Sequence, residues 1–381
     1  LRRVLFRSWP QWRYDLSALT GPLTDVSRAQ GLLLGRMADV GMALRDQASL
    51  AALTEDVVKT SEIEGEVLNV QSVRSSIARR MGVDIGAVAP VDRHVEGVVE
   101  MVLDATTRAT EPLTAERLFG WHAALFPTGR SGITPIVVGG WREHPEPMQI
   151  VTPRLGQPDV VHYQAPDSRD VPAQMARLIG WFNDADVGAR LDGLVRAAIA
   201  HLWLEAIHPF EDGNGRIGRA LADLAMAQDL RSGQRVFSLS RQMWLDRAGY
   251  YRQLQAATSQ PVLDVTPWVR WFVGCVEQAC GATVAQVQGA ARKSAFWAAL
   301  QAAHPQLTAS QRKVLNKLYD AGPDGFIGGM STEKYTAIAQ VSRATAYREL
   351  TELVALGVLV KSGQGRGTRY ALSGALEGVS G

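Results

Sequence analysis

The sequence predicts a mainly α-helical protein with a helical N-terminal region, a helical core that carries one β-hairpin flap, and a C-terminal winged helix-turn-helix. Three observations support this prediction. Apolar residues recur at helical spacing along most of the 381 residues. The segment 127–166 breaks that pattern with clustered Gly and Pro residues and short apolar runs. Residues 305–375 show the pattern of three helices followed by two strands.

The chain divides by pattern into an N-terminal region, 9–90, a core, 91–290, and a C-terminal unit, 305–375. A polar stretch with a Pro, 82–92, marks the first boundary. Residues 1–8 (LRRVLFRS) lack an initiator Met and a cleavage site, so we interpret them as a non-native leader and exclude them from fold reasoning.

The periodicity and the turn signals give the bounds of each expected element. The expected helices are 33–51, 54–68, 73–81, 94–107, 115–125, 171–183, 191–207, 215–228, 246–257, 266–290, 310–318, 331–339 and 342–356. The runs 136–138 and 149–151 are expected as short strands or a hairpin in the core. The runs 358–360 and 368–372 are expected as the two strands of the wing.

Composition excludes several classes of protein. The apolar fraction of 46% is enough for a sizeable core, and the net charge of +2 does not by itself indicate a nucleic-acid binder. The spacing of Cys275 and Cys280 fits no metal or redox motif, so we expect core thiols in a reducing, cytoplasmic compartment. No run of 18 apolar residues occurs, so no membrane span is expected.

The segment 208–219, HPFEDGNGRIGR, carries the chemistry. It follows a mostly apolar helix, so a buried helix delivers His208 to the start of a glycine-rich loop. Histidine titrates near neutrality and can accept a proton from a hydroxyl. Gly213 and Gly215 allow a tight turn and a close approach to a ligand, and the next helix begins with free N–H groups that favour an anion.

Charged side chains in the same segment suit a phosphate ligand. Arg216 and Arg219 are three residues apart, so they take neighbouring positions on the helix. Guanidinium groups bind phosphate oxygens in a fixed geometry. Asp212 is a hard oxygen ligand of the kind that holds Mg²⁺ against phosphates.

This segment matches every fixed position of H-x-F-x-[D/E]-G-N-G-R-x-x-R, the signature of the Fic family, and the chain resembles that family from 9 to 290. The resemblance implies a protein adenylyltransferase that uses ATP and Mg²⁺ to place AMP on a Ser, Thr or Tyr hydroxyl of a target protein. It implies these roles: His208 as the base, Phe210 as an anchor, Asp212 as the Mg²⁺ ligand, Asn214 with the loop amides of Gly213 and Gly215 on the α-phosphate, and Arg216 and Arg219 on the outer phosphates.

Two further segments resemble parts of the family. The stretch 141–166 is similar to the hairpin that docks the target, which implies docking by Met148, Gln149, Ile150 and Val151. Tyr250 and Tyr251 are expected to line the adenine pocket. The alternative for this pair is one buried and one exposed helix aromatic.

An inhibitory motif is also indicated. Thr60 to Gly65 resembles the family pattern [S/T]-x-x-x-E-[G/N], and Thr60 and Glu64 share a helix face. The resemblance implies that Glu64 pairs with Arg219 and withholds it from the γ-phosphate of ATP. It also allows Glu64 to position water for removing AMP from the target. The alternative is a surface helix with several glutamates.

The C-terminal unit is basic. Nine basic and five acidic residues between 310 and 372 give a net charge of +4. Arg343 and Arg348 fall on the expected recognition helix, and Arg366 and Arg369 on the wing, which favours contacts with DNA phosphates. The alternative is a module for protein contacts. A homodimer through the N-terminal helices is a further expectation.

Other functions fit parts of the sequence. A Fic enzyme could use another nucleotide donor, because the grip on the diphosphate is shared. A DNA-binding regulator could use the core only to sense nucleotide, although a sensor needs no base at His208. Glu205 and His208 have the E-x-x-H spacing of di-iron bundles, but the sequence contains no second E-x-x-H.

Overall fold

The computed structural model describes residues 11–86, 89–146, 148–154, 157–230, 235–259, 263–321 and 328–373. Within these ranges, the side chains of 150–154, 157–162 and Arg366 are outside the description. The expected leader, 1–8, also lies outside the described residues, as do Trp9 and Pro10.

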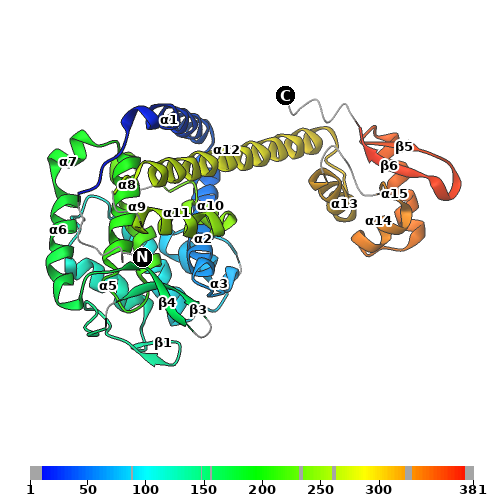
Figure 1. Ribbon diagram of the computed structural model, residues 1–381. Helices are drawn as coiled ribbons and strands as arrows, with labels where there is room; N and C mark the ends of the chain where they lie inside the picture. Colours follow the sequence, from blue (N-terminus) through cyan, green and yellow to red (C-terminus); the bar gives the residue numbers. More distant parts are fainter. Residues whose placement is uncertain are drawn as a thin grey trace. The chain divides into compact units, whose positions relative to one another are not determined.

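The fold is mainly α, as predicted, with fifteen α-helices and three two-stranded antiparallel sheets in the described ranges (Figure 1). Contacts divide the chain into two compact units, which meet in sequence at Val284 and Ala285. The elements that begin in the first unit are α1 (Leu16–Asp39), α2 (Met42–Ile63), α3 (Val70–Met81), α4 (Arg93–Thr107), α5 (Ala115–Leu125), β1 (Arg130–Ser131), β2 (Thr134–Pro135), β3 (Gln149–Arg154), β4 (Gln157–Gln164), the 3₁₀ helix η2 (Ser168–Asp170), α6 (Val171–Asn183), α7 (Ala185–Arg190), α8 (Gly193–Ile207), α9 (Asn214–Leu230), α10 (Leu239–Leu245), α11 (Arg247–Ser259) and α12 (Thr266–Ala303).

The first unit is built around α8. This helix is apolar on all sides and nearly all of its residues are buried, which is typical of a central helix. Helix α9 packs along it, and Trp268 of α12 donates its indole N–H to the carbonyl of Ala198 at 2.7 Å. Since α8 ends at His208, the packing of the core determines where that histidine lies.

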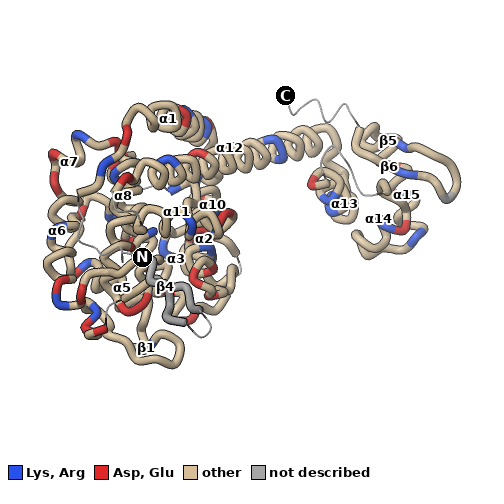
Figure 2. The backbone as a smooth tube through the Cα atoms, in the orientation of Figure 1, with Lys and Arg blue, Asp and Glu red and all other residues tan. Residues whose placement is uncertain are grey.

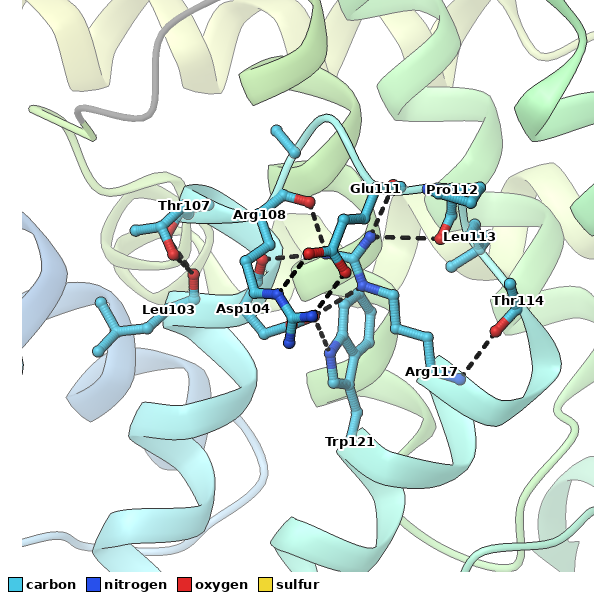
Figure 3. Close-up of polar contacts among 12 residues, drawn as sticks. Leu103, Asp104, Thr107, Arg108, Glu111, Pro112, Leu113, Thr114, Arg117 and Trp121 are labelled. Atoms are coloured by element: carbon cyan, nitrogen blue, oxygen red, sulfur yellow. Dashed lines mark hydrogen bonds and ion pairs between the residues drawn. The ribbon is translucent and has the colours of Figure 1, made fainter.

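Helices α4 and α5 are joined by a polar cluster (Figure 3). Arg117 and Trp121 of α5 both donate to Asp104 of α4, each at 2.7 Å. Their shared acceptor fixes α5 against α4. Helix α5 in turn carries His122, which lies against the loop after α8.

The end of α2 differs from the prediction. A helix over 54–68 was expected, but α2 runs from Met42 to Ile63. Gly65 has φ +87°, and the N–H groups of Gly65 and Glu66 donate to Glu62 and Ser61. This is a Schellman motif, in which a left-handed glycine ends the helix. The apolar pattern continued past Gly65, so periodicity alone gave the wrong end.

The predicted start of α2 was also wrong. One helix over 33–51 was expected, but the chain is extended at Val40 and Gly41 between α1 and α2. The turn falls inside a continuous helical pattern, where a single Gly is only a weak stop signal. The sequence pattern also gave no prediction for α7, α10 or the first half of α1, since α7 and α10 are short and Pro22 lies inside α1.

The β-hairpin is present, but with other bounds. β3 pairs with β4, whereas the expected strand at 136–138 has no strand partner. The N–H of Val137 donates instead to a carboxylate oxygen of Glu211, and that of Gly139 donates to Nδ1 of His122. Side chains from the loop after α8 and from α5 therefore take the place of a partner strand at these two N–H groups. β1 and β2 form a further small hairpin around Gly132.

The second unit has the predicted order of three helices followed by a hairpin. Its elements are α13 (Ala309–Asp320), α14 (Thr332–Ala339), α15 (Arg343–Ala355), β5 (Leu359–Ser362), the 3₁₀ helix η3 (Gly365–Gly367) and β6 (Arg369–Leu372). Its own apolar core includes Leu315, Leu350 and Tyr370, and Met330 adds a bridge to the β6 side of the hairpin.

No helix in the described ranges is long and apolar enough to cross a bilayer. Cys275 and Cys280 are both free and buried, as predicted.

Candidate active site

His208 directly follows α8 in a left-handed conformation, with φ 51° and ψ 61°. Its N–H donates to the carbonyl of Leu204 at 2.8 Å, which closes the last turn of the helix. The chain then reverses through the glycine-rich loop into α9. The imidazole lines a cavity and keeps 33% of its side-chain surface exposed there.

The surroundings keep His208 neutral. Burial lowers the pKa of His208 to about 4, and the positive charge of Arg142 acts in the same direction. At neutral pH the imidazole is therefore free to accept a proton. Nδ1 lies 4.0 Å from a carboxylate oxygen of Glu205. Burial, followed by the charge of Glu64, raises the pKa of Glu205 to about 7.

Asn214 fixes the shape of the loop. Its side-chain oxygen accepts from the N–H of Phe210 and its amide donates to the carbonyl of Phe210, both at 2.9 Å. The ring of Phe210 is fully buried and stacks on His122 with centroids 4.3 Å apart. The Asn214 side chain, expected on the α-phosphate, thus holds the loop closed, and Phe210 anchors the loop in the core.

The start of α9 has the features of an anion site. The first N–H groups of a helix have no partner within it, and the helix dipole favours negative charge there. Gly213 has φ +83°, a conformation that favours glycine. At Gly215, an added Cβ would lie 2.2 Å from Oε1 of Glu64. The carboxylate of Glu64 therefore lies against this helix end.

Asp212 fits the role of a Mg²⁺ ligand. Its side chain lines the cavity and is 44% exposed. Oδ1 accepts the N–H of Gly213 at 2.6 Å, and Ser131 donates its hydroxyl to Oδ2. Within the described ranges, no three His, Cys, Asp or Glu side chains group as a metal site. One carboxylate suits Mg²⁺, which keeps waters and takes phosphate oxygens as ligands. The di-iron alternative gains no support.

Both arginines of the segment are buried and held by the chain itself. Arg219 is 1% exposed; its Nε donates to the hydroxyl of Thr60 at 2.7 Å, and its Nη2 donates to the Thr60 carbonyl at 2.9 Å. Nη2 also lies 2.8 Å from Oε1 of Glu64. Burial alone would lower the pKa of Arg219, but Glu64 raises it above its usual value. The structure thus shows the expected contact between Thr60, Glu64 and Arg219.

Arg216 has a partner that sequence reasoning missed. Its Nη1 donates to Oε2 of Glu66 at 2.7 Å, and the guanidinium lies over the ring of Phe126. His94 of α4 meets the same Glu66 oxygen at 3.2 Å, and this hydrogen bond raises the pKa of His94. Gly65 therefore separates two carboxylates, Glu64 and Glu66, that each hold one arginine.

The cavity beside His208 has a volume of about 440 Å³, within the range of ligand pockets. Tyr250 and Tyr251 of α11 both line it. Tyr250 is buried and its hydroxyl lies 2.9 Å from Nε2 of His201, while Tyr251 is 42% exposed and donates to the Ile63 carbonyl. One aromatic is therefore buried and one exposed, and both line the cavity, while adenine binding by this pair stays a prediction.

The β3–β4 hairpin borders the same cavity. Met148 and Gln149 line it, and Gln149 donates to Gln164 across the hairpin at 2.9 Å. Tyr163 of β4 also lines it and donates its hydroxyl to the Ala206 carbonyl at 2.7 Å. The side chains of Ile150 and Val151 lie outside the described residues.

Comparison with known proteins identifies the domains. Residues 112–226 match the model described as the Fic/DOC family. These residues therefore form a Fic/DOC family domain. Residues 6–83 match a second model, described as a domain of unknown function (DUF4172). The Fic/DOC match contains the whole loop from His208 to Arg219, and the second match contains Thr60, Glu64 and Glu66.

Curated Fic proteins are distant relatives of the chain. It is 36% identical over 145 residues to "Protein adenylyltransferase fic-1" of Caenorhabditis briggsae, covering 38% of this chain and 26% of that protein. It is 26% identical over 237 residues to "Protein adenylyltransferase Fic" of Culex quinquefasciatus, covering 61% and 42%. The chain thus spans between about a quarter and a half of the length of these relatives.

Solved structures show the same fold. A Fic family protein from Desulfovibrio desulfuricans aligns over 94% of this chain and 96% of its own, with 21% identity and a TM-score of 0.50. A Fic domain containing signaling protein from Bacteroides thetaiotaomicron aligns over 70% of this chain and 97% of its own, with 18% identity and a TM-score of 0.53.

Proposed function

We propose that the protein is an adenylyltransferase that moves AMP from ATP to a hydroxyl group of a target protein. One observation carries the proposal: a neutral imidazole, that of His208, lies in a cavity that also contains the N-terminus of α9. A base beside an anion site is what phosphoryl-group chemistry on a hydroxyl requires. The distant adenylyltransferase relatives support the same reaction.

The residues suggest the following course. The target hydroxyl gives its proton to His208, and its oxygen attacks the α-phosphorus of ATP. The bond to the bridging oxygen breaks, pyrophosphate leaves, and AMP remains on the target. The amides at the start of α9 would hold phosphate oxygens, and Asp212 would hold Mg²⁺, whose charge would offset that of the phosphates. The protein contributes mainly positioning and electrostatic stabilisation.

The target would dock on the β3–β4 hairpin. Both strands of this sheet pair only with each other in the described ranges, so their outer edges are free for an extended peptide. Because Met148 and Gln149 line the cavity, a peptide on this edge lies beside His208. A Ser, Thr or Tyr side chain could then reach the base.

Glu64 would keep the enzyme inactive. Its carboxylate makes an ion pair with Arg219, where an outer phosphate of ATP would bind, and lies at the start of α9, where the α-phosphate would bind. The carboxylate thus stands in for a phosphate oxygen. ATP must displace it to bind productively, so we expect a low basal rate.

The test is transfer of label from α-³²P-ATP with Mg²⁺, to the protein itself and to proteins of a lysate. We expect little transfer by the wild type, a clear rise for Glu64→Gly, and loss of that rise in Glu64→Gly with His208→Ala. Removing a general base costs about 10²- to 10⁴-fold. The matched control is Glu62→Gly, because Glu62 pairs with Lys59 on the same helix at 2.7 Å.

The outcomes separate the alternatives. Adding Arg219→Ala to Glu64→Gly should cancel the rise, because the freed arginine is then missing. Transfer from labelled UTP or a phosphocholine donor, but not from ATP, would replace AMP transfer with the other-donor hypothesis. Loss of label from a premodified target that depends on Glu64 would indicate AMP removal. A Glu64→Gly protein that transfers no nucleotide contradicts the proposal.

A second role, binding of duplex DNA by the second unit, is favoured by the surface of α15. Arg343, Tyr347 and Arg348 are all exposed on this helix. Further exposed basic residues lie on α13 and the β5–β6 hairpin; they are Arg312, Lys313, Lys317 and Lys361. Figure 2 colours Lys and Arg blue along the backbone of both elements. Basic side chains on the recognition helix and wing suit phosphate contacts.

Fluorescence anisotropy of the full-length protein with a labelled duplex would test this role. Binding should weaken steeply with salt, and Arg348→Ala should lower the log–log salt slope by about 0.9 for the lost phosphate contact. Absence of binding at low salt would leave a module for protein contacts as the better hypothesis.

A further inference from the structure

The backbone of His208 is in an unfavourable conformation. A residue other than glycine pays about 1–2 kcal/mol for the left-handed region. In the described part of the chain, only Gln340 shares a positive φ without being glycine. Such a conformation persists only where its surroundings fix it, and it is common at functional sites.

Arg142 makes the contacts that fix this turn. Its Nε donates to the carbonyl of His208 at 2.7 Å, and its backbone N–H donates to the next carbonyl, that of Pro209, at 2.8 Å. Its Nη2 donates to the carbonyl of Pro166, which follows β4. One residue thus holds two successive carbonyls of the turn and ties them to the base of the hairpin.

Burial makes this arrangement costly. Arg142 is 3% exposed, and burial lowers its pKa although the charge of Asp167 acts in the opposite direction. Its Nη1 lacks a hydrogen-bond partner among the described atoms. An unpaired buried charge is unfavourable for folding. A purely structural turn could be held by neutral groups, so the charge itself suggests a function.

The charge acts on the neighbouring imidazole. After burial, Arg142 is the strongest influence that lowers the pKa of His208, while Glu205, Glu64 and Asp212 act in the opposite direction. A positive charge near the imidazole disfavours its protonated form, so Arg142 helps to keep His208 neutral. The same side chain that holds the turn therefore also adds to the effect of burial on the pKa of the imidazole.

We propose that Arg142 is the positioning residue of the base: it holds the left-handed turn at His208 and so directs the imidazole into the cavity. The inference rests on the proposed AMP transfer, since it takes His208 as the base. Arg142 itself touches neither nucleotide nor target in this scheme.

The experiment compares Arg142→Met and Arg142→Lys in the Glu64→Gly background. Methionine keeps the length and loses the charge, while lysine keeps the charge and loses the planar fork. The control is Arg169→Met, an exposed arginine of the neighbouring η2 that pairs with Asp167. The readouts are kcat, KM for ATP, and the pKa of His208 from NMR of ¹³C-labelled histidine, assigned with His208→Ala.

We expect both variants to lower kcat by about 100-fold, the cost of misplacing a catalytic group by about 1 Å, with little change in KM. The pKa of His208 should rise toward its ordinary value in Arg142→Met and stay low in Arg142→Lys. Guanidinium ion should partly rescue an Arg142→Ala protein. The Arg169→Met control should match its parent.

Unchanged kcat and unchanged His208 titration in Arg142→Met would overturn the proposal. The proposal would also be overturned if both variants lost kcat/KM equally and only through a higher KM, because Arg142 would then serve only to anchor the β3–β4 hairpin. If Arg142→Met fails to fold, the Arg142→Lys variant decides: a kcat equal to that of the Glu64→Gly parent would overturn the proposal. If the Glu64→Gly parent transfers no AMP, the proposed function fails, while the NMR titration still decides the effect of Arg142 on His208.

Discussion

Replacing Gly65 with alanine tests whether the end of α2 holds both carboxylates in place. Gly65 has φ +87°, and its built Cβ meets no atom within 4 Å, so the only penalty is conformational. That penalty is about 1–2 kcal/mol for an alanine in the left-handed region. The folded chain can avoid it by unwinding the last turn of α2, which displaces Glu64 and Glu66 from their arginines.

The magnitude follows from this penalty. If the closed arrangement dominates in the wild type, 1–2 kcal/mol raises the open fraction by a factor of about 5–30. We expect a similar rise in AMP transfer from α-³²P-ATP at subsaturating ATP. Gly65→Asn is the control, because asparagine tolerates the left-handed region and should give a smaller rise. An alanine variant as inactive as the wild type, beside an active Glu64→Gly, would refute the reasoning.

Three further predictions follow. Glu66→Gln should weaken the hold on Arg216 and raise AMP transfer beyond Glu64→Gly alone, measured in the double variant; equal rates would show that Arg216 is already free. A pKa raised to about 7 means that folded Glu205 keeps its proton up to near-neutral pH, so the free energy of unfolding falls as pH rises from about 4.5 to 7, and thermal melts of Glu205→Gln should show a smaller fall over this range. Gly97→Ala places a Cβ 1.8 Å from a backbone oxygen of α5 and should destabilise the protein by about 1–3 kcal/mol, whereas Gly120→Ala, with open space, should not.

Local signals predicted much of the fold. The bounds of α5 and α6 match the structure, because Thr114 caps one helix and Asp170 with Pro172 begins the other. The predicted end of α2 was wrong because the apolar pattern continues past Gly65, the left-handed residue that stops the helix. The strand expected at 136–138 was wrong because the N–H of Val137 donates to the side chain of Glu211, a partner that no local pattern reveals.

The site shows the same division. The loop from His208 to Arg219 is contiguous in sequence, so its residues could be assigned together. Glu66 meets Arg216 across 150 residues, and Arg142 meets His208 across 66. No periodicity or spacing links such pairs, and only the packing of α2 and the hairpin against α8 and α9 brings them together.

Glu64, whose carboxylate pairs with Arg219, lies at the end of a helix that is firmly anchored in the core. Helix α2 is anchored through Asp56, which accepts hydrogen bonds from Ser238 and from the N–H of Ser240 at 2.6 and 3.0 Å. Arg235, at 3.6 Å from Asp56, makes a second ion pair with Asp223 of α9. Dissociating α2 would expose this buried charge network together with the apolar face of the helix. Under the proposed inhibition by Glu64, an activator would therefore have to act on the last turn of α2 and not on the N-terminal region as a whole.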